Sequence, residues 1–210
     1  MQNLLKDPLH PASLQEINKF LVSCRLCPLN KEPYYPGAPV PGIGTAPATI
    51  MIIGEAPGEH EAEPSGYQVE DIDTGRPFVG VAGKALKKLL QKTGYSFDFT
   101  YISNVAKHRP PGNRNPTVVE IKTCSTHILS REIEIVKPKV IVCLGRVAAS
   151  AIASLAGYTL PRGSIRGHRF MFNDINIFCT WHPAYACGYN RDAEPELEAD
   201  LQEVLNEFSP

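Results

Sequence analysis

The sequence has little net charge, few cysteines and no long apolar run. Among its 210 residues, 21 basic side chains nearly balance 22 acidic ones, for a formal net charge of −1. A protein that coats long stretches of nucleic acid needs a broad basic surface, so that class is excluded, whereas a small footprint on a few phosphates is not. Six cysteines are too few for a disulfide scaffold.

Membrane and secretion signals are also missing. No run of about 20 apolar residues exists, so the sequence predicts no membrane span. Residues 1–15 lack the apolar core of a secretion signal. We therefore expect a cytoplasmic protein without membrane contact, folded as a single domain over residues 1–210 and acting as a monomer.

Short apolar runs alternate with segments of helical spacing. The runs that predict buried strands are residues 49–53, 100–105, 139–144 and 175–180. The segments that predict helices between and after them are residues 81–93, 117–136, 147–156 and 194–208. This order favours a three-layer α/β/α fold around a central, mostly parallel four-stranded sheet.

Local signals refine this prediction. Thr117 and Glu120 form a capping box that opens the long helix predicted over 117–136. Asn173 and Asp174 predict a hairpin turn before the last strand. The proline- and glycine-rich stretch 28–47 predicts an extended loop.

Unusual residues follow three of the predicted strands. The sequence GEAPG occupies residues 54–58, Asn104 ends the second strand, and His182 follows the fourth. Ligands of open parallel sheets bind at the carboxyl ends of the strands. Taken singly, Asn104 is typical of a turn, His182 of a structural histidine before a proline, and Phe78 of a core residue. Their occurrence together indicates a binding site.

The cysteines fall into two groups. Cys143 and Cys179 lie inside apolar runs and are expected to be buried core thiols. Cys24 and Cys27 are spaced C-x-x-C after a helix-like segment, which indicates a metal site.

Five segments, in this order, resemble the uracil-DNA glycosylase superfamily. They are GEAPG at 54–58, GRPFVGVAG at 75–83, SNV at 103–105, RPPGNR at 109–114 and HPA at 182–184. The pattern is most similar to family 4, whose members carry a [4Fe-4S] cluster. The resemblance extends from Cys24 to His182. It implies a four-stranded parallel sheet between helices and, in base excision repair, removal of uracil from DNA to leave an abasic site.

The resemblance also implies how the base is held. A base inside a duplex is out of reach, so the enzyme must flip it out. Phe78 would stack on the base, and the Asn104 amide would pair with uracil O4 and N3–H, a pattern that cytosine does not match. His182 would hydrogen-bond to O2 of the leaving uracil anion. The residues placed around the base are Glu55, Ala56, Pro57, Phe78, Asn104 and His182.

One position departs from the best-known branch of the superfamily. Ala56 stands where that branch has an aspartate that assists the attacking water, although family 4 also lacks it. Glu55 is the candidate for this role, with Glu59 or Glu61 as the alternative. No lysine at a pocket motif is available for a Schiff base, so we expect a monofunctional hydrolase without strand cleavage. The predicted catalytic residues are Glu55, Asn104 and His182.

The family's cluster ligands are four cysteines, and here Cys24, Cys27 and Cys124 match three of them. The fourth position, sixteen residues before Cys124, holds His108. Imidazole can replace a thiolate on iron. The resemblance therefore implies a structural [4Fe-4S] cluster with Cys3His ligation, and zinc bound by the same four residues is the alternative.

Two loops are expected to contact uracil-containing DNA. Arg109 and Arg114 are the candidate phosphate contacts. Family members often have a leucine-bearing loop after the histidine motif that fills the gap left by the base. Tyr185 is the candidate here, with packing at the base of the loop as the alternative. A covalent branch of the superfamily has a basic insertion that residues 110–116 lack, so we expect turnover and no trapped adduct.

The acidic segment 59–74 contains six carboxylates and no lysine or arginine. It is expected to be a solvated surface loop, or else to shape the DNA path by repulsion. Two other functions stay open: a non-catalytic DNA-binding or damage-sensing module, and a glycosylase for another deaminated base such as hypoxanthine.

Overall fold

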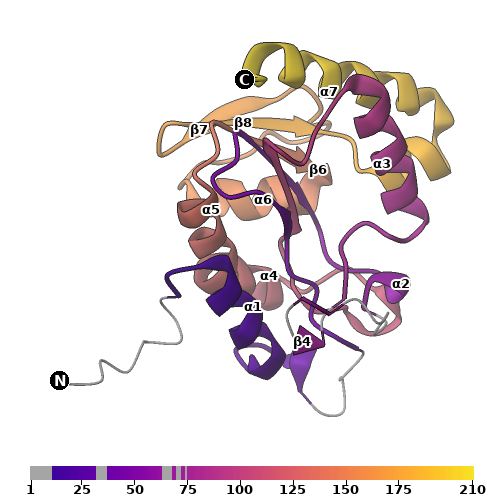
Figure 1. Ribbon diagram of the computed structural model, residues 1–210. Helices are drawn as coiled ribbons and strands as arrows, with labels where there is room; N and C mark the ends of the chain where they lie inside the picture. Colours follow the sequence, from indigo (N-terminus) through magenta and orange to yellow (C-terminus); the bar gives the residue numbers. More distant parts are fainter. Residues whose placement is uncertain (1–10, 32–36, 63–67, 70–71, 74) are drawn as a thin grey trace.

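A computed structural model of the protein describes residues 11–31, 37–62, 68–69, 72–73 and 75–210. Its centre is a six-stranded sheet in the order β1-β5-β2-β6-β8-β7 (Figure 1). The strands are β1 (Ile43–Gly44), β2 (Ile50–Gly54), β5 (Thr100–Asn104), β6 (Val140–Leu144), β7 (Arg169–Phe172) and β8 (Ile175–Thr180). The four inner strands are parallel, which confirms the predicted centre, and β1 and β7 add antiparallel edges.

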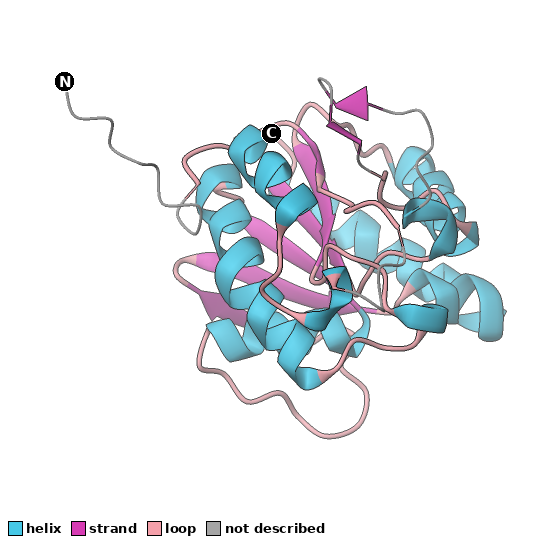
Figure 2. Ribbon diagram, turned by 90° about the horizontal axis from the view of Figure 1, so that it is seen from below, coloured by secondary structure: helices cyan, strands magenta, loops and turns pink. Residues whose placement is uncertain are grey.

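Helices cover both faces of this sheet (Figures 1 and 2). The helices are α1 (Leu14–Ser23), α2 (Glu59–Ala62), α3 (Val81–Thr93), α4 (Val118–Cys124), α5 (Ser130–Val136), α6 (Gly145–Leu155) and α7 (Glu194–Phe208). A short hairpin of β3 (Gln68–Val69) and β4 (Ile72–Asp73) stands apart from the main sheet. Among the described residues, no helix is both long enough and apolar enough to cross a membrane.

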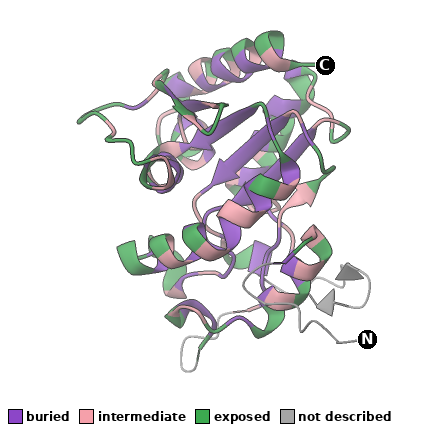
Figure 3. Cartoon of the chain, turned by 90° about the vertical axis from the view of Figure 1, so that its left-hand side faces the viewer, coloured by how far each residue is buried: buried purple, intermediate pink, exposed green. Residues whose placement is uncertain are grey.

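Alternate residues of each inner strand pack against different helices. In β2, Ile50 and Ile52 join a core with α3 and α7, whereas Met51 and Ile53 join a core with α5 and α6. Because both faces are covered, every residue of β2, β5 and β6 is buried (Figure 3). The structure therefore has the three predicted layers.

Most local predictions are confirmed. Thr117 and Glu120 form the reciprocal capping box of α4, with distances of 3.3 Å and 2.7 Å. Asn173 and Asp174 both have positive φ, as the tight turn between β7 and β8 requires. Cys143 and Cys179 are fully buried neighbours on β6 and β8.

Two local predictions are incomplete. The helix expected over 117–136 is present from its Thr117 cap to Val136, but it contains a π turn, Ser125–Leu129, between α4 and α5. Periodicity alone does not reveal one additional residue in a turn. The stretch 28–47, expected to be loop throughout, contributes β1, which pairs with Tyr101 and Ile102 of β5. A two-residue edge strand is too short to leave a pattern in the sequence.

Candidate active site

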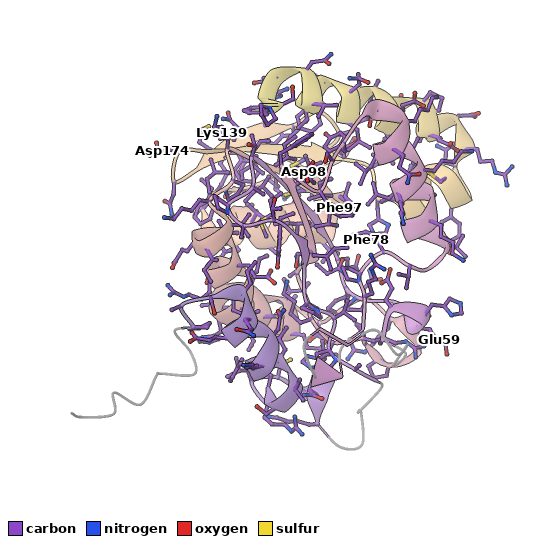
Figure 4. The ribbon with its side chains drawn as sticks, viewed as in Figure 1. Glu59, Phe78, Phe97, Asp98, Lys139 and Asp174 are labelled. Atoms are coloured by element: carbon purple, nitrogen blue, oxygen red, sulfur yellow. The ribbon has the colours of Figure 1, made fainter. Side chains whose placement is uncertain are left out.

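A cavity of about 470 Å³ opens at the carboxyl ends of β2, β5 and β8. It lies at the end of the sheet expected for a ligand site of a parallel α/β fold. In Figure 4, Phe78 lies beside the sheet and Glu59 lies on α2, whereas Lys139 and Asp174, which precede β6 and β8, lie at the far end. All six residues expected around the base line this cavity: Glu55, Ala56, Pro57, Phe78, Asn104 and His182.

Gly54 allows two of these side chains to meet. It is the last residue of β2 and pairs in register with Asn104 of β5. A Cβ atom at Gly54 would lie 2.4 Å from Asn104 Oδ1 and 2.7 Å from Phe78 Cζ. Only a residue without a side chain therefore permits the amide and the aromatic ring to approach each other at the end of this strand.

The backbone of Phe78 is itself unusual. Its φ is 57°, in the left-handed region that residues with large side chains rarely adopt. Gly83, in the first turn of α3, packs directly against it, since a Cβ there would lie 2.3 Å from Phe78 Cα. Strained backbone of this kind persists when its surroundings hold it, and it is common at ligand sites.

His182 is held in one tautomer. The backbone N–H of Ala184 donates to His182 Nδ1 at 3.1 Å, so the neutral ring carries its proton on Nε2. Burial lowers the pKa of His182 below its ordinary value of 6.5, which favours this neutral form. Gly145, with φ of 82°, lies beneath the side chain, where a Cβ would be 3.0 Å from that of His182. The site thus contains a fixed, uncharged hydrogen-bond donor.

Three carboxylates line the same cavity but differ in environment. Glu55 is half-buried, and burial raises its pKa. Glu59 is exposed and pairs with Arg109 at 3.5 Å. Glu61 is buried and accepts a hydrogen bond from the backbone N–H of Gly58 at 2.8 Å.

Glu61 connects two loops of the cavity. Burial raises its pKa, and the backbone N–H groups of Gly58, Phe78, Val79 and Gly80 oppose that rise. The carboxylate is therefore occupied with main-chain donors, which leaves Glu55 as the better candidate to orient water. The expectation of a solvated acidic loop is wrong at Glu61. The other acidic positions 63, 70 and 71 lie outside the described residues.

The predicted metal ligands come from three separate segments. Cys24 caps α1, Cys27 lies three residues later, and Cys124 ends α4. Burial raises the pKa of all three thiols, that of Cys124 to about 12, and Cys24 and Cys27 raise it further through their charge.

His108 is buried near this group. Its Nε2 lies 3.2 Å from the carbonyl oxygen of Leu21 in α1, and burial lowers its pKa to about 4. A histidine whose one nitrogen donates to a backbone carbonyl has its other nitrogen available as a ligand. No set of three or more His, Cys, Asp or Glu side chains within the described part of the chain is arranged to hold a single metal ion.

The three residues expected to contact DNA are placed differently. Arg114 lines the cavity and forms a bidentate ion pair with Glu120, with both distances 2.8 Å. The side chain of Arg109 is only 16% exposed, lies against Glu59 and does not line the cavity. Tyr185 packs against Trp181 in a tilted arrangement, with ring centroids 4.9 Å apart and the ring planes at 43°, and is also outside the cavity.

Tyr189 is a feature that the sequence did not reveal. It lies at the end of a π turn, Tyr185–Tyr189, lines the cavity and is 90% exposed. Large aromatic side chains are seldom so exposed without a partner. Two tyrosines four residues apart look equivalent in the sequence. The structure distinguishes them, since Tyr185 is 39% exposed and packs against Trp181, whereas Tyr189 is 90% exposed.

The chain is similar in sequence to proteins of one known family. The family model described as "Uracil DNA glycosylase superfamily" matches residues 41–208. The chain is 38% identical to a type-4 uracil-DNA glycosylase of Sulfurisphaera tokodaii, an alignment that covers 91% of this chain and 83% of that protein. It is 37% identical to the type-4 uracil-DNA glycosylase of Archaeoglobus fulgidus, over 91% of this chain and 92% of that protein. It is 40% identical to the type-4 uracil-DNA glycosylase of Saccharolobus solfataricus, over 81% of this chain and 76% of that protein. The chain therefore belongs to the uracil-DNA glycosylase superfamily, in its type-4 branch.

Proposed function

We propose that this protein removes uracil from DNA by hydrolysing the N-glycosidic bond, which leaves an abasic site. One observation carries the proposal: Phe78, Asn104 and His182, from three distant parts of the chain, line one cavity together. An aromatic ring, an amide and a neutral imidazole are the groups needed to stack, read and release a pyrimidine.

Base recognition is assigned to Asn104 and Phe78. The Asn104 amide provides one acceptor for uracil N3–H and one donor for uracil O4. Cytosine has an acceptor and a donor in the opposite places, so its binding would leave buried polar groups unpaired. The ring of Phe78 would cover the face of the base and recover part of the free energy lost on unstacking, about 1–3 kcal/mol per base.

Departure of the base is assigned to His182. When the bond between C1′ and N1 breaks, its electron pair goes to uracil, and negative charge builds up on O2. Because Ala184 fixes the Nε2–H tautomer, His182 can donate to O2 without first losing or gaining a proton. Water then forms the new bond to C1′, and Glu55 would orient it and accept its proton.

The cysteine-lined site would hold the family's [4Fe-4S] cluster through Cys24, Cys27, Cys124 and Nδ1 of His108. The donor chemistry fits, since the set offers three thiols and an imidazole whose Nε2 already donates to the carbonyl oxygen of Leu21. The cluster would join segments of the fold. Broad absorbance near ~400 nm with four irons per chain is expected. Stoichiometric zinc would instead favour the Cys3His zinc site.

The function is tested with a labelled oligonucleotide that contains one uracil. After incubation and hot alkali, the strand should break at the uracil. Asn104→Ala and His182→Ala should each lower the rate by about 100-fold or more. Wild-type rates in both variants would remove the assigned roles. No alkali-sensitive site with the unmodified protein would favour a non-catalytic DNA-binding module.

Two further substrates define the reaction. Oligonucleotides with cytosine or hypoxanthine in place of uracil should stay intact, and cleavage of the latter would extend the base range. With substrate in excess, the protein should convert all of it. A DNA adduct that survives a denaturing gel would contradict turnover.

A further inference from the structure

A fully buried ion pair lies behind the cavity. Lys107 and Glu132 are both 0% exposed, and Lys107 Nζ is 2.6 Å from Glu132 Oε2. The ammonium group also donates to Ser103 Oγ and to the backbone carbonyl of Asn104, each at 2.6 Å. All three of its protons thus have acceptors, and two of these acceptors belong to the last two residues of β5.

Such a pair is poorly explained by stability alone. Removing two charges from water offsets most of their attraction, and buried pairs are often replaced by apolar residues without loss of stability. Lys107 does not line the cavity, so its ammonium is not available to the base. The pair does provide a charge-assisted hydrogen bond to the backbone carbonyl group of Asn104.

The main chain of Lys107 is also held. Its carbonyl oxygen accepts from Val40 N–H at 2.8 Å. The ammonium therefore extends from a fixed backbone and has little freedom to follow a displacement of β5.

The π turn brings Cys124 and Glu132 to the same side of their helix. They are eight residues apart, which in a regular α-helix places two side chains about 80° apart. The turn Ser125–Leu129 accommodates one additional residue. Cys124 and Glu132 are then spaced as two residues seven positions apart would be in a regular helix, so their side chains point in directions within about 20° of each other. Glu132 consequently reaches the ammonium group of Lys107 from the side of the helix that carries Cys124.

We propose that Lys107, held by Glu132 and Ser103, is a positioning residue. It fixes the end of β5 so that the Asn104 amide is oriented to form its hydrogen bonds with the base. This inference rests on the proposed function, because it assigns Lys107 an effect only through base recognition by Asn104. It predicts that the contribution of Lys107 to excision depends on the presence of the Asn104 amide.

The test is a double-mutant cycle on single-turnover uracil excision. Lys107→Met combined with Glu132→Gln removes both charges and keeps similar side-chain volumes. The amide oxygen of the glutamine can still accept the hydrogen bond from the Ser103 hydroxyl, so this variant should fold. In the wild-type background it should excise about 100-fold more slowly, as expected for a misplacement of about 1 Å. In the Asn104→Ala background the same pair of changes should cost less than about threefold.

Ser103→Ala is the second, milder variant, since it removes one of the three contacts of the ammonium group. It should slow excision several-fold, again only while Asn104 is present. Binding to abasic-site DNA, which offers no base to read, should stay within about twofold in every variant, and thermal unfolding confirms folding.

The outcomes separate the two proposals. Equal losses in both backgrounds would mean a general structural role for Lys107 and would overturn the inference. Undiminished excision by the Lys107→Met, Glu132→Gln protein would also overturn it. If Asn104→Ala itself excises uracil at the wild-type rate, the assigned base recognition fails and the inference fails with it.

Discussion

Replacement of Gly54 by alanine tests the geometry of the site with a single methyl group. The added Cβ would lie 2.4 Å from Asn104 Oδ1 and 2.7 Å from Phe78 Cζ, where carbon contacts normally begin near ~3.5 Å. Asn104 is buried, and Phe78 is held from behind by Gly83. Each side chain must therefore move by about 1 Å.

The expected loss follows from this displacement. A misplacement of about 1 Å in an active site reduces the rate by about 100-fold, which corresponds to ~2.7 kcal/mol in the activation free energy. Overpacking also lowers the free energy of unfolding by about 1–3 kcal/mol. The activity loss should therefore persist at temperatures where the Gly54→Ala protein is fully folded.

The assay is single-turnover excision with enzyme in excess over a uracil-containing oligonucleotide. Gly58→Ala is the matched control, because it adds the same methyl group in the same motif but the nearest atom, Glu61 Oε2, is 3.9 Å away. The control should lose far less activity, within about threefold. Similar rates for Gly54→Ala and the wild type would refute the packing argument, as would equal losses in the two variants.

Three further predictions concern other parts of the site. Nitrogen NMR should show His182 neutral and protonated on Nε2 from about pH 8 to pH 6.5, because burial lowers its pKa. The contribution of neutral His182 to the stability of the folded protein is complete above the pKa of the unfolded state and declines as the pH falls below it. A cationic ring at pH 7 would contradict this prediction. Tyr189→Ala should slow excision from duplex DNA roughly tenfold but hardly change it on single strands, where no gap needs filling. Tyr185→Ala should mainly lower the melting temperature. The reverse result would restore Tyr185 as the residue that fills the gap left by the base. Glu61→Ala should raise KM about tenfold by freeing the N–H groups beside Phe78, with Glu61→Gln intermediate, and an unchanged KM would argue against this link.

Much of the fold could be predicted because its determinants are local. β2 and β6 are continuous apolar runs, β5 and β8 carry apolar residues between polar ones, and each is followed by a segment with helical spacing. Parallel strands covered on both faces require this pattern. The edge of the sheet that carries the cavity then follows from strand direction alone, so that Asn104 and His182 could be expected to lie near each other.

The remainder depends on contacts between distant segments. The ion pair of Lys107 with Glu132 joins residues 25 positions apart, and a lysine beside a histidine and an arginine looks solvated in the sequence. The π turn that aligns Glu132 has no residue signature. Arg109 and Arg114 look like free phosphate contacts, yet Arg109 pairs with Glu59 across a different loop.

Three residues in or behind the cavity break local rules. Phe78 adopts a left-handed backbone, Lys107 buries a charge completely, and Glu61 buries a carboxylate in an acidic segment that would otherwise be solvated. Each departure opposes folding when considered alone. Two of them also bond to residues that line the cavity: Glu61 to backbone N–H groups of the Phe78 loop, and Lys107 to the carbonyl oxygen of Asn104. Residues that conflict with local preference and converge in space are expected where structure is selected for function.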